Sequence, residues 1–408
     1  MLGFTEIVSW GVLYYSFSVF VAPMSAELGG SRAAIAGALS VMLVVSGIAG
    51  VAVGRWLDDH GPRLLMTAGS VAAALLTVAW SRVGGLPSYY AVWILIGLAF
   101  AATNYSPAFA TITVWFRRFR ARALTVMTLI AGFSSTLFVP LAAWLVATHG
   151  WRDALLYLAA LLAVTTIPIH ALVLRRRPSD LGLGIDGDAF APPAGAPPPA
   201  PEVSSSLREA LRHPSFPWIA GAFAIYALGV GVGIHLVAFL HDEGYPLAFA
   251  AAATGGLGIA QVLGRLAFAP LEERLPQRTL ALLIYAACPV ALAVLLLVPN
   301  PAGVVVFVAL FGAGRGSETL LRSTLVARYY GARRFASIYG VLTLFMTGTQ
   351  ALAPVALGVA YDAARTYVPG LWVLVALLCG SSLSIYVADR RRQRTEEGGT
   401  VTVTEMTT

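Results

Sequence analysis

The stretch GRWLDDHGPR (residues 54–63) follows one long apolar run and leads directly into another. Gly54 allows two helices to approach closely, Asp58 falls where a helix ends, and Arg63 starts the next apolar run. The same spacing returns in APLEERLPQR (residues 269–278), again between two apolar runs. The sequence therefore predicts two halves of similar build, each with a short charged turn at an equivalent place.

The chain is too apolar for an ordinary soluble protein. Of its 408 residues, 58% are hydrophobic and 12% are charged, with a mean hydropathy of +0.77; a soluble surface needs more charge than that. About 20 apolar residues cross the hydrocarbon core of a bilayer as one helix. We therefore predict an all-α membrane protein with twelve transmembrane helices, in residues 4–24, 33–57, 63–82, 88–114, 123–147, 152–174, 216–240, 247–270, 278–298, 302–326, 334–361 and 368–388.

The longest loop between predicted spans divides the chain into halves. It covers residues 175–215 and contains the tract APPAGAPPPAP, whose prolines favour extended backbone that cannot pack a core. We expect an N-terminal six-helix bundle (1–174), this linker, a C-terminal six-helix bundle (216–388) and a tail (389–408). Two repeated bundles suit alternating access, because they can rock about a site held between them.

All 27 basic residues are arginines, and their distribution predicts orientation. If the apolar runs are membrane spans, twenty arginines lie on the membrane side that also holds the linker, four lie on the opposite side and three lie inside spans. The positive-inside rule makes the linker side, with both termini, cytoplasmic. We expect the inner (plasma) membrane of a bacterium, with the lipid bilayer as a partner. The net charge of +7 is spread over short loops, so nucleic-acid binding is not expected.

The loop GRWLDDHGPR resembles the signature loop of the major facilitator superfamily through Gly54, Asp58, Gly61 and Arg63. It departs from that pattern at His60 and at the proline before Arg63. The resemblance implies two six-helix bundles and a gate, whose ion pairs form in one state and break in the other. The alternative interpretation is a tight charged turn without a gating role.

A narrower resemblance links the chain to the monocarboxylate transporter and oxalate:formate exchanger branch. It rests on GVLYYSFSVFVAPM (residues 11–24), THGWRDAL (residues 148–155) and the stretch that starts at ASIYGVLTLF (residues 336–345). In that branch an arginine of the eighth span binds the substrate carboxylate, and the matching residue is Arg265. The branch's aspartate one turn earlier is Gln261 here, which cannot titrate. Alternatively, Arg265 extends to the membrane interface or forms a structural ion pair.

Span ten contains GAGRGSETLLR (residues 312–322), with three charged residues on one helical face. Arg315, Glu318 and Arg322 are spaced i, i+3 and i+7. Each intramembrane charge costs about 2.5–3.5 kcal/mol on insertion scales, which favours a functional use. We consider Arg315 a substrate ligand and Glu318 a proton carrier. The alternative is that Arg315 and Glu318 neutralise each other while Arg322 extends to the cytoplasmic face.

Two further titratable residues lie within spans. His235 is able to titrate near neutral pH and is a second candidate proton carrier, with a hydrogen-bonded packing role as its alternative. Glu6 lies near the start of span one, where we expect a solvated acid at a helix start. Neutral polar groups in mid-span are candidates for the second carboxylate oxygen, or else pack in the core. These are Tyr14, Tyr15, Asn104, Tyr105 and Gln350.

The sequence thus predicts a secondary transporter of a small organic anion, a monocarboxylate, coupled to protons. Moving an anion inward against a negative interior costs ~2.3 kcal/mol per 100 mV, which a co-transported proton cancels. Electroneutral exchange is the main alternative, followed by proton-driven efflux and a receptor that does not transport. No nucleophile triad, zinc spacing or phosphate-binding glycine loop is present in the sequence, so no enzyme, cofactor or metal site is predicted.

Overall fold

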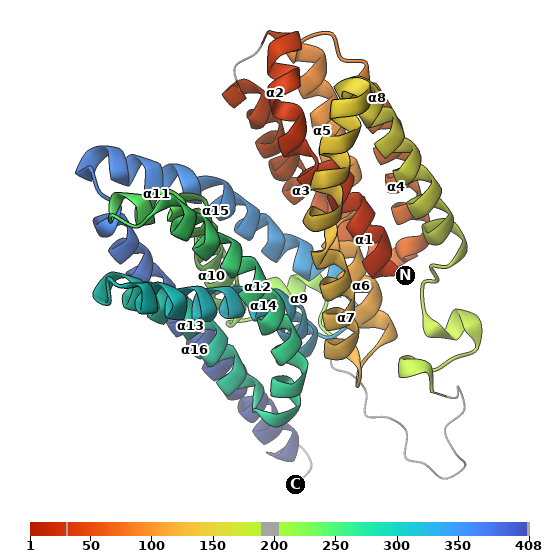
Figure 1. Ribbon diagram of the computed structural model, residues 1–408. Helices are drawn as coiled ribbons and strands as arrows, with labels where there is room; N and C mark the ends of the chain where they lie inside the picture. Colours follow the sequence, from red (N-terminus) through yellow and green to blue (C-terminus); the bar gives the residue numbers. More distant parts are fainter. Residues whose placement is uncertain (30–31, 189–203, 406–408) are drawn as a thin grey trace. The chain divides into compact units, whose positions relative to one another are not determined.

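The computed structural model describes residues 1–29, 32–188 and 204–405, and every regular element in these ranges is a helix (Figure 1). The predicted all-helical fold is confirmed. The Pro-rich tract of the linker lies outside the described residues. The first half of the chain forms α1 (Leu2–Trp10), the π-helix η1 (Gly11–Tyr15), α2 (Phe17–Leu28), α3 (Arg32–His60), α4 (Pro62–Ser81), α5 (Leu86–Thr103), α6 (Tyr105–Trp115), α7 (Arg120–Gly132) and α8 (Ser134–Leu172).

The second half begins with short helices and continues with longer ones. The 3-10 turns η2 (Pro178–Leu181) and η3 (Ile185–Gly187) follow α8. The remaining helices are α9 (Leu207–Arg212), α10 (Phe216–Ala227), α11 (Val230–Asp242), α12 (Leu247–Arg274), α13 (Gln277–Leu297), α14 (Pro301–Tyr330), α15 (Phe335–Ala364) and α16 (Val368–Glu405).

The chain divides into two compact units. Unit 1 contains Met1–Ser204 and Tyr330–Leu344, and unit 2 contains Ser205–Tyr329 and Phe345–Thr408. Helix α15 therefore begins in unit 1 and ends in unit 2. The predicted bundle boundaries at residues 174, 216 and 388 stay a prediction.

Within the described ranges, eleven helical stretches are long and apolar enough to cross a membrane. One of them, Arg120–Leu172, contains the fifth predicted span and all but the last two residues of the sixth. Gly150 separates these spans with a φ of 77°, a left-handed conformation that favours glycine. All twelve predicted spans thus fall on helices. Large apolar side chains also face outward, Val164 at 74% and Ile259 at 67% exposure, as lipid contact requires.

Packing within unit 1 relies on aromatic side chains. Trp80 and Trp93 are fully buried and meet edge to face at 4.8 Å, with Phe20 and Phe17 against them. Such pairs each contribute about 0.5–1.5 kcal/mol beyond the area they bury. In a bilayer this contact energy matters more than water exclusion, because lipid tails are as apolar as the core.

Small residues set the packing of α12 on α14 in unit 2. A Cβ on Gly264 would lie 2.2 Å from the backbone oxygen of Ala313, and one on Gly316 would lie 2.1 Å from that of Gln261. Ser317 also donates to the Gly264 carbonyl at 2.9 Å. The two helices therefore touch along their backbones, which holds the charged face of α14 at a fixed distance from α12.

Four predicted spans are interrupted, which periodicity alone did not indicate. Span one contains the π-turn η1, in which the Ser16 N–H and hydroxyl both donate to the Gly11 carbonyl. Span four breaks at Asn104, whose extended backbone separates α5 from α6. Span five breaks at Phe133, between α7 and α8. Span seven breaks between α10 and α11 at Gly229. Interrupted spans and π-turns concentrate at binding sites of transporters, so these breaks direct attention to their neighbours.

Candidate functional site

A cavity of about 110 Å³ lies within unit 2, on the charged face of α14. Its walls come from α10, α12, α14 and α15. Most of its lining side chains are polar or charged: Tyr226, Gln261, Arg315, Glu318, Thr319, Arg322 and Gln350, beside Phe223, Ala227 and Met346. The structure thus brings together three predicted residues, Arg315, Glu318 and Gln350.

Glu318 pairs with Arg322, one helical turn along α14. The Glu318 Oε1 lies 3.0 Å from Arg322 Nε, and the two side chains are only 7% and 13% exposed. The alternative in which Glu318 pairs with Arg315 and Arg322 extends outward is therefore wrong. Helical side chains lean toward the N-terminus, so Arg322 reaches back to Glu318. A second Arg322 nitrogen lies 2.8 Å from the Met346 sulfur, which further keeps it inside.

Arg315 is held at the break in span seven. Its guanidinium donates to the Tyr226 carbonyl at 3.2 Å, and its central carbon lies 5.7 Å from the centre of the Tyr226 ring. A Cβ on Gly229 would lie 2.9 Å from an Arg315 nitrogen, so glycine leaves room for the guanidinium there. The break in the span therefore positions one cation at the cavity while other guanidinium nitrogens keep their donors for a ligand.

Arg265 does not line this cavity. Its side chain is half-buried on α12, four residues or about 6 Å after Gln261, which does line it.

Two other lining residues, Tyr226 and Thr319, were not predicted from the sequence, and Gln261 was noted only as a departure from the resemblance. The signal that could have found Tyr226 is its place in YALGVGVG (residues 226–233), where glycines interrupt an apolar run.

His235 lies apart from Glu318, in a narrow hollow of unit 2 with Tyr367 and Leu371. Its Nε2 lies 3.0 Å from the Pro354 carbonyl, which only accepts, so this nitrogen carries the proton. Its Nδ1 then accepts from the Tyr367 hydroxyl at 3.1 Å. Both ring nitrogens of a neutral histidine are thereby satisfied, which is the geometry of the packing alternative.

In unit 1, the predicted tyrosines form one aromatic cluster around Trp10. The ring centres of Tyr14, Tyr15 and Tyr105 lie 5.2, 6.2 and 5.0 Å from that of Trp10. The π-turn allows Tyr14 and Tyr15, which are adjacent in sequence, to both reach Trp10. On a regular α-helix two neighbouring side chains point about 100° apart, so the π-turn is what lets both reach one ring.

Asn104 has a structural role in this unit. Its Oδ1 accepts from the Ser106 N–H at 2.9 Å, which caps the start of α6. Its amide nitrogen donates to the Ser46 hydroxyl at 3.3 Å, which ties the break to α3. Asn104 therefore creates the interruption beside Tyr105, and its role as a substrate ligand stays a prediction.

Glu6 is fully buried, so the expectation of a solvated acid at a helix start is wrong. Helix α1 packs closely on its neighbours: a Cβ on Gly3 would lie 3.0 Å from the Met127 carbonyl oxygen, and Ser134 donates to the Ile7 carbonyl at 2.7 Å. Sequence reasoning missed this because a position early in a span says nothing about which side α7 and α8 cover.

The loop at residues 54–63 holds the start of α15 within unit 1. Asp58 accepts from the N–H groups of Ala336 and Ser337 at 3.1 and 2.9 Å, and from the Ser337 hydroxyl. A carboxylate at a helix N-terminus satisfies unpaired donors and the helix dipole. Beside it, Asp59 forms an ion pair with Arg334, which precedes α15.

The glycines and the arginine of this loop fix its shape. A Cβ on Gly54 would lie 2.2 Å from the Ala336 carbonyl oxygen, so only glycine allows α3 this close to α15. Gly61 has a φ of 80°, a conformation that side chains rarely adopt. Arg63 donates from Nε to the Ala171 carbonyl at 2.6 Å, which joins α4 to the end of α8. Their role in a gate stays a prediction.

Residues 2–354 match the family model of the Major Facilitator Superfamily. The chain belongs to this superfamily. Bovine (Bos taurus) monocarboxylate transporter 13 is 27% identical over 388 residues, covering 94% of this chain and 86% of that protein. The oxalate:formate antiporter of Oxalobacter formigenes is 27% identical over 164 residues, covering 40% of this chain and 38% of that one. The predicted resemblance is confirmed by these relatives.

Two solved structures share the fold of this major facilitator protein. The E. coli fucose:proton symporter has a TM-score of 0.69 at 13% identity, covering 95% of this chain and 97% of that one. A human organic anion transporter has a TM-score of 0.66 at 14% identity, covering 94% and 97%. The chain is therefore an integral membrane protein of a transporter superfamily with the twelve-helix fold.

Proposed function

We propose that this transporter carries a small monocarboxylate together with a proton, by alternating access. The observation that carries the proposal is the unit 2 cavity, in which two arginines face one glutamate. With all three groups charged the cavity has a net charge of plus one, which suits a single carboxylate. A volume of about 110 Å³ corresponds to roughly four water molecules at ~30 Å³ each. Such a cavity matches a small anion better than a large hydrophobic compound.

In this proposal Arg315 binds the carboxylate. Its guanidinium already has one nitrogen on the Tyr226 carbonyl, so its remaining donors are pre-oriented. Gln261 and Gln350 line the same cavity and offer amide donors to the second carboxylate oxygen. Arg265, which the resemblance to monocarboxylate transporters indicates as the carboxylate ligand, lies one turn along α12 from Gln261 and outside the lining of this cavity, and its role stays a prediction. The tyrosines around Trp10 remain candidates for substrate contact in unit 1.

Glu318 carries the proton in this proposal. It is the acid of the cavity, and its charge is balanced by Arg322 at 3.0 Å. When a substrate carboxylate engages the arginines, the positive charge that stabilises ionised Glu318 is shared, and proton uptake becomes favourable. The anion and the proton then move with no net charge. His235 is the weaker candidate because neutral His235 has both ring nitrogens in hydrogen bonds.

Electroneutral anion exchange is the second candidate. The specific observation in its favour is that the position one turn before Arg265 is Gln261, which cannot take up a proton, and that Glu318 is already neutralised by Arg322. If Glu318 and Arg322 stay ion-paired throughout the cycle, Glu318 takes up no proton, and Arg315 would bind the anion without proton coupling. The Oxalobacter formigenes relative is named an antiporter.

Orientation completes the proposal. Because the arginine-rich loops lie at one end of the spans, we infer that this end, with both termini, faces the cytoplasm of a bacterial cell, in the inner membrane. With this orientation an inward proton gradient would drive the anion into the cell.

The test is uptake of labelled formate, acetate, lactate, pyruvate and oxalate into proteoliposomes, with and without an imposed inward proton gradient. We expect one monocarboxylate to accumulate several-fold more with the gradient, and Glu318→Gln to remove this stimulation. Stimulation by internal unlabelled anion, unchanged by pH and by Glu318→Gln, would establish exchange instead. If none of the anions is transported by either route, the proposal is wrong.

A further inference from the structure

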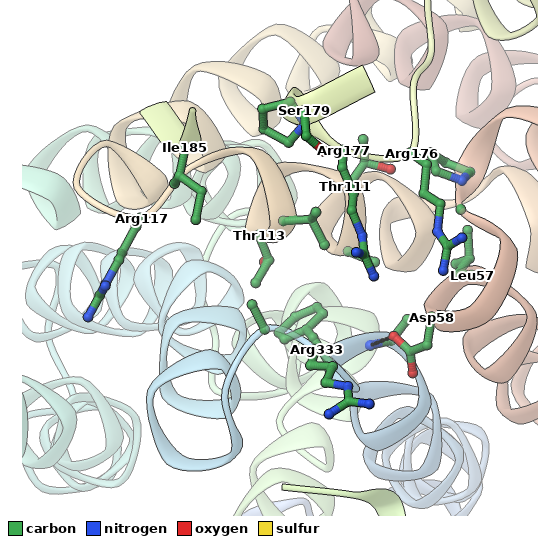
Figure 2. Close-up of a pocket in the computed structure, with 18 of the residues that line it drawn as sticks. Leu57, Asp58, Thr111, Thr113, Arg117, Arg176, Arg177, Ser179, Ile185 and Arg333 are labelled. Carbon is green, nitrogen blue, oxygen red and sulfur yellow. Dashed lines mark hydrogen bonds between the residues drawn. The ribbon is translucent and has the colours of Figure 1, made fainter. Parts of the chain in front are cut away.

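A second cavity, of about 580 Å³, lies within unit 1 at the arginine-rich end (Figure 2). Its walls are the end of α3, the start of α4, the end of α6, the segment after α8 and the turn before α15. This volume is within the range of about 300–1,000 Å³ typical of small-molecule sites. It is about five times that of the unit 2 cavity, so its ligand is of another size class.

The side chains around this cavity are strongly cationic. Five arginines line it, against Asp58 as the one acid among the described lining residues. Figure 2 shows Arg176 and Arg177 projecting from the segment after α8, with Arg333 across from them near Asp58. A carboxylate ligand needs one guanidinium, whereas a phosphate group offers oxygens to several at once.

Three acids at this cavity accept hydrogen bonds from backbone N–H groups and form no ion pair with the arginines that line it, among the residues that the structure describes. Asp58 accepts from the start of α15. Asp180 accepts from the Arg176 and Arg177 N–H groups at 3.0 and 3.1 Å. Asp186 accepts from the N–H groups of residues 117, 118 and 119 at 3.0, 2.9 and 3.2 Å. The acids thus shape the backbone that presents the arginines.

Three of the five arginines are available to a ligand. Arg120 donates to the Phe116 and Thr113 carbonyls at 3.0 and 3.2 Å, and Arg117 points away from the group in Figure 2. By contrast, Arg176, Arg177 and Arg333 form no ion pair with any residue that the structure describes. Three guanidinium groups without ion pairs around one cavity repel one another, and an anion bound between them would relieve this repulsion.

The glycine of the signature loop takes part in this arrangement. A Cβ on Gly61 would lie 2.6 Å from the Arg176 Cγ and 2.8 Å from its Cβ. The stem of Arg176 therefore rests on the turn between α3 and α4, where only a glycine fits. Trp115 also donates to the Arg175 carbonyl at 3.3 Å, which holds the same segment against α6. The site is built by packing as well as by charge.

We propose that this cavity binds a phosphate-bearing anion, through Arg176, Arg177 and Arg333. The phosphate belongs either to a soluble compound or to a phospholipid headgroup. Because Arg333 precedes α15 while Arg176 and Arg177 follow α8, the ligand joins these two segments. It thereby stabilises the arrangement in which Asp58 caps α15.

The test measures the melting temperature of the full-length protein in nanodiscs of neutral phosphatidylcholine, titrated with inorganic pyrophosphate at constant ionic strength. A second series replaces 30% of the lipid by phosphatidylglycerol. We expect one of the two anions to raise the melting temperature by several degrees. Pyrophosphate acting in neutral nanodiscs identifies a soluble ligand, and phosphatidylglycerol acting alone identifies a lipid headgroup.

The variants locate the effect. The triple variant Arg176→Gln, Arg177→Gln, Arg333→Gln is expected to need at least tenfold more anion, and Arg333→Gln alone covers the case in which the triple variant does not fold. Arg82→Gln is the matched control, since Arg82 is exposed just after α4, roughly 30 Å along that helix from Pro62. Arg315→Gln tests whether the anion binds in the unit 2 cavity instead. We expect its melting temperature to shift with the anion as that of the wild type does. The proposal is contradicted if neither anion shifts the melting temperature. It is also contradicted if Arg333→Gln and the triple variant both shift as much as the wild type at the same anion concentration.

Discussion

The two cavities use the same cation in opposite ways. In unit 2, the Arg322 side chain is only 13% exposed, and Glu318 of the same helix neutralises it at 3.0 Å. In unit 1, Arg176, Arg177 and Arg333 are exposed, and the acids nearby bind backbone N–H groups instead. A buried charge without a counter-charge is costly, whereas water tolerates an exposed one. The low exposure of Arg322 thus goes with a carboxylate partner on its own helix, whereas the exposed arginines of unit 1 need none; half-buried Arg315 is held by the Tyr226 carbonyl instead.

The largest effect is expected from breaking the buried pair. Glu318→Gln leaves Arg322 buried without its carboxylate, and should lower the free energy of unfolding by about 3–5 kcal/mol. Replacing both residues, Glu318→Leu with Arg322→Met, should restore most of the stability, while the stimulation of uptake by a proton gradient stays lost. Denaturant unfolding in detergent, with uptake measured in parallel, checks both statements. Equal stability of Glu318→Gln and wild type would show that the pair does not hold the cavity together.

Removing the cap on α15 should have a moderate effect. Asp58→Ala deletes the acceptor for two N–H groups and a hydroxyl at the start of α15, and caps of this kind contribute about 0.5–2 kcal/mol. The melting temperature in detergent measures the loss. Val164→Ala, on a lipid-exposed side chain, is the control, and a loss as small as in that variant would contradict the capping role.

Asp58→Asn sharpens the comparison of the cavities, because it removes a charge and preserves the shape. It deletes the described acid that lines the unit 1 cavity, so pyrophosphate should bind several-fold more tightly. The same titration in nanodiscs measures this change. Unchanged or weaker binding would mean that Asp58 does not act electrostatically on the cavity.

Gly61→Ala should produce a smaller loss of stability, roughly 1 kcal/mol, because alanine is strained at a φ of 80°. The added Cβ also meets the stem of Arg176, so pyrophosphate binding should weaken together with stability. Gly84→Ala, at a position with open space around it, provides the control. If Gly61→Ala lowers stability but leaves pyrophosphate binding unchanged, Gly61 does not contribute to the anion site.

The smallest effect concerns an exposed pair at the opposite end of unit 1. Glu27 accepts from the Trp151 indole and from Arg152 Nε at 2.8 Å, and these hydrogen bonds, in that order, lower the pKa of its carboxyl. Because the pKa is lower in the folded state, the ionised carboxyl stabilises the fold. This stabilisation is fully present above the unfolded pKa of about 4.3 and is lost as the pH falls through the folded pKa. The difference in melting temperature between wild type and Glu27→Gln should therefore shrink below about pH 4, with Asp153→Asn as control. A difference that is independent of pH would contradict this.

The helical fold could be read from the sequence because each span carries its own signal in length and hydropathy. All twelve predicted spans coincide with helices, and Arg315, Glu318 and Gln350 do line one cavity. What failed depends on contacts that periodicity does not encode. The partner of Glu318 follows from side-chain direction on α14, and the burial of Glu6 follows from the packing of α1 on α7 and α8.

The unit 1 cavity could not be predicted at all. Its arginines come from three separate loops, and in the sequence each loop looks like a simple orientation signal. Only the fold shows that Gly61 supports Arg176 and that Asp180 and Asp186 bind backbone groups. The interruptions at η1, Asn104 and Gly229 were equally invisible to hydropathy, because their effect is on backbone geometry rather than on polarity.

The central claim is that a guanidinium in the unit 2 cavity binds the transported anion. The most direct measurement compares initial uptake of the best labelled monocarboxylate by wild type, Arg315→Gln and Arg82→Gln in proteoliposomes with equal protein content. A charge-assisted hydrogen bond contributes about 1.5–3 kcal/mol, which predicts roughly 10- to 150-fold slower uptake by Arg315→Gln at low substrate concentration. Arg82→Gln should match the wild type. Undiminished uptake by Arg315→Gln would contradict the account.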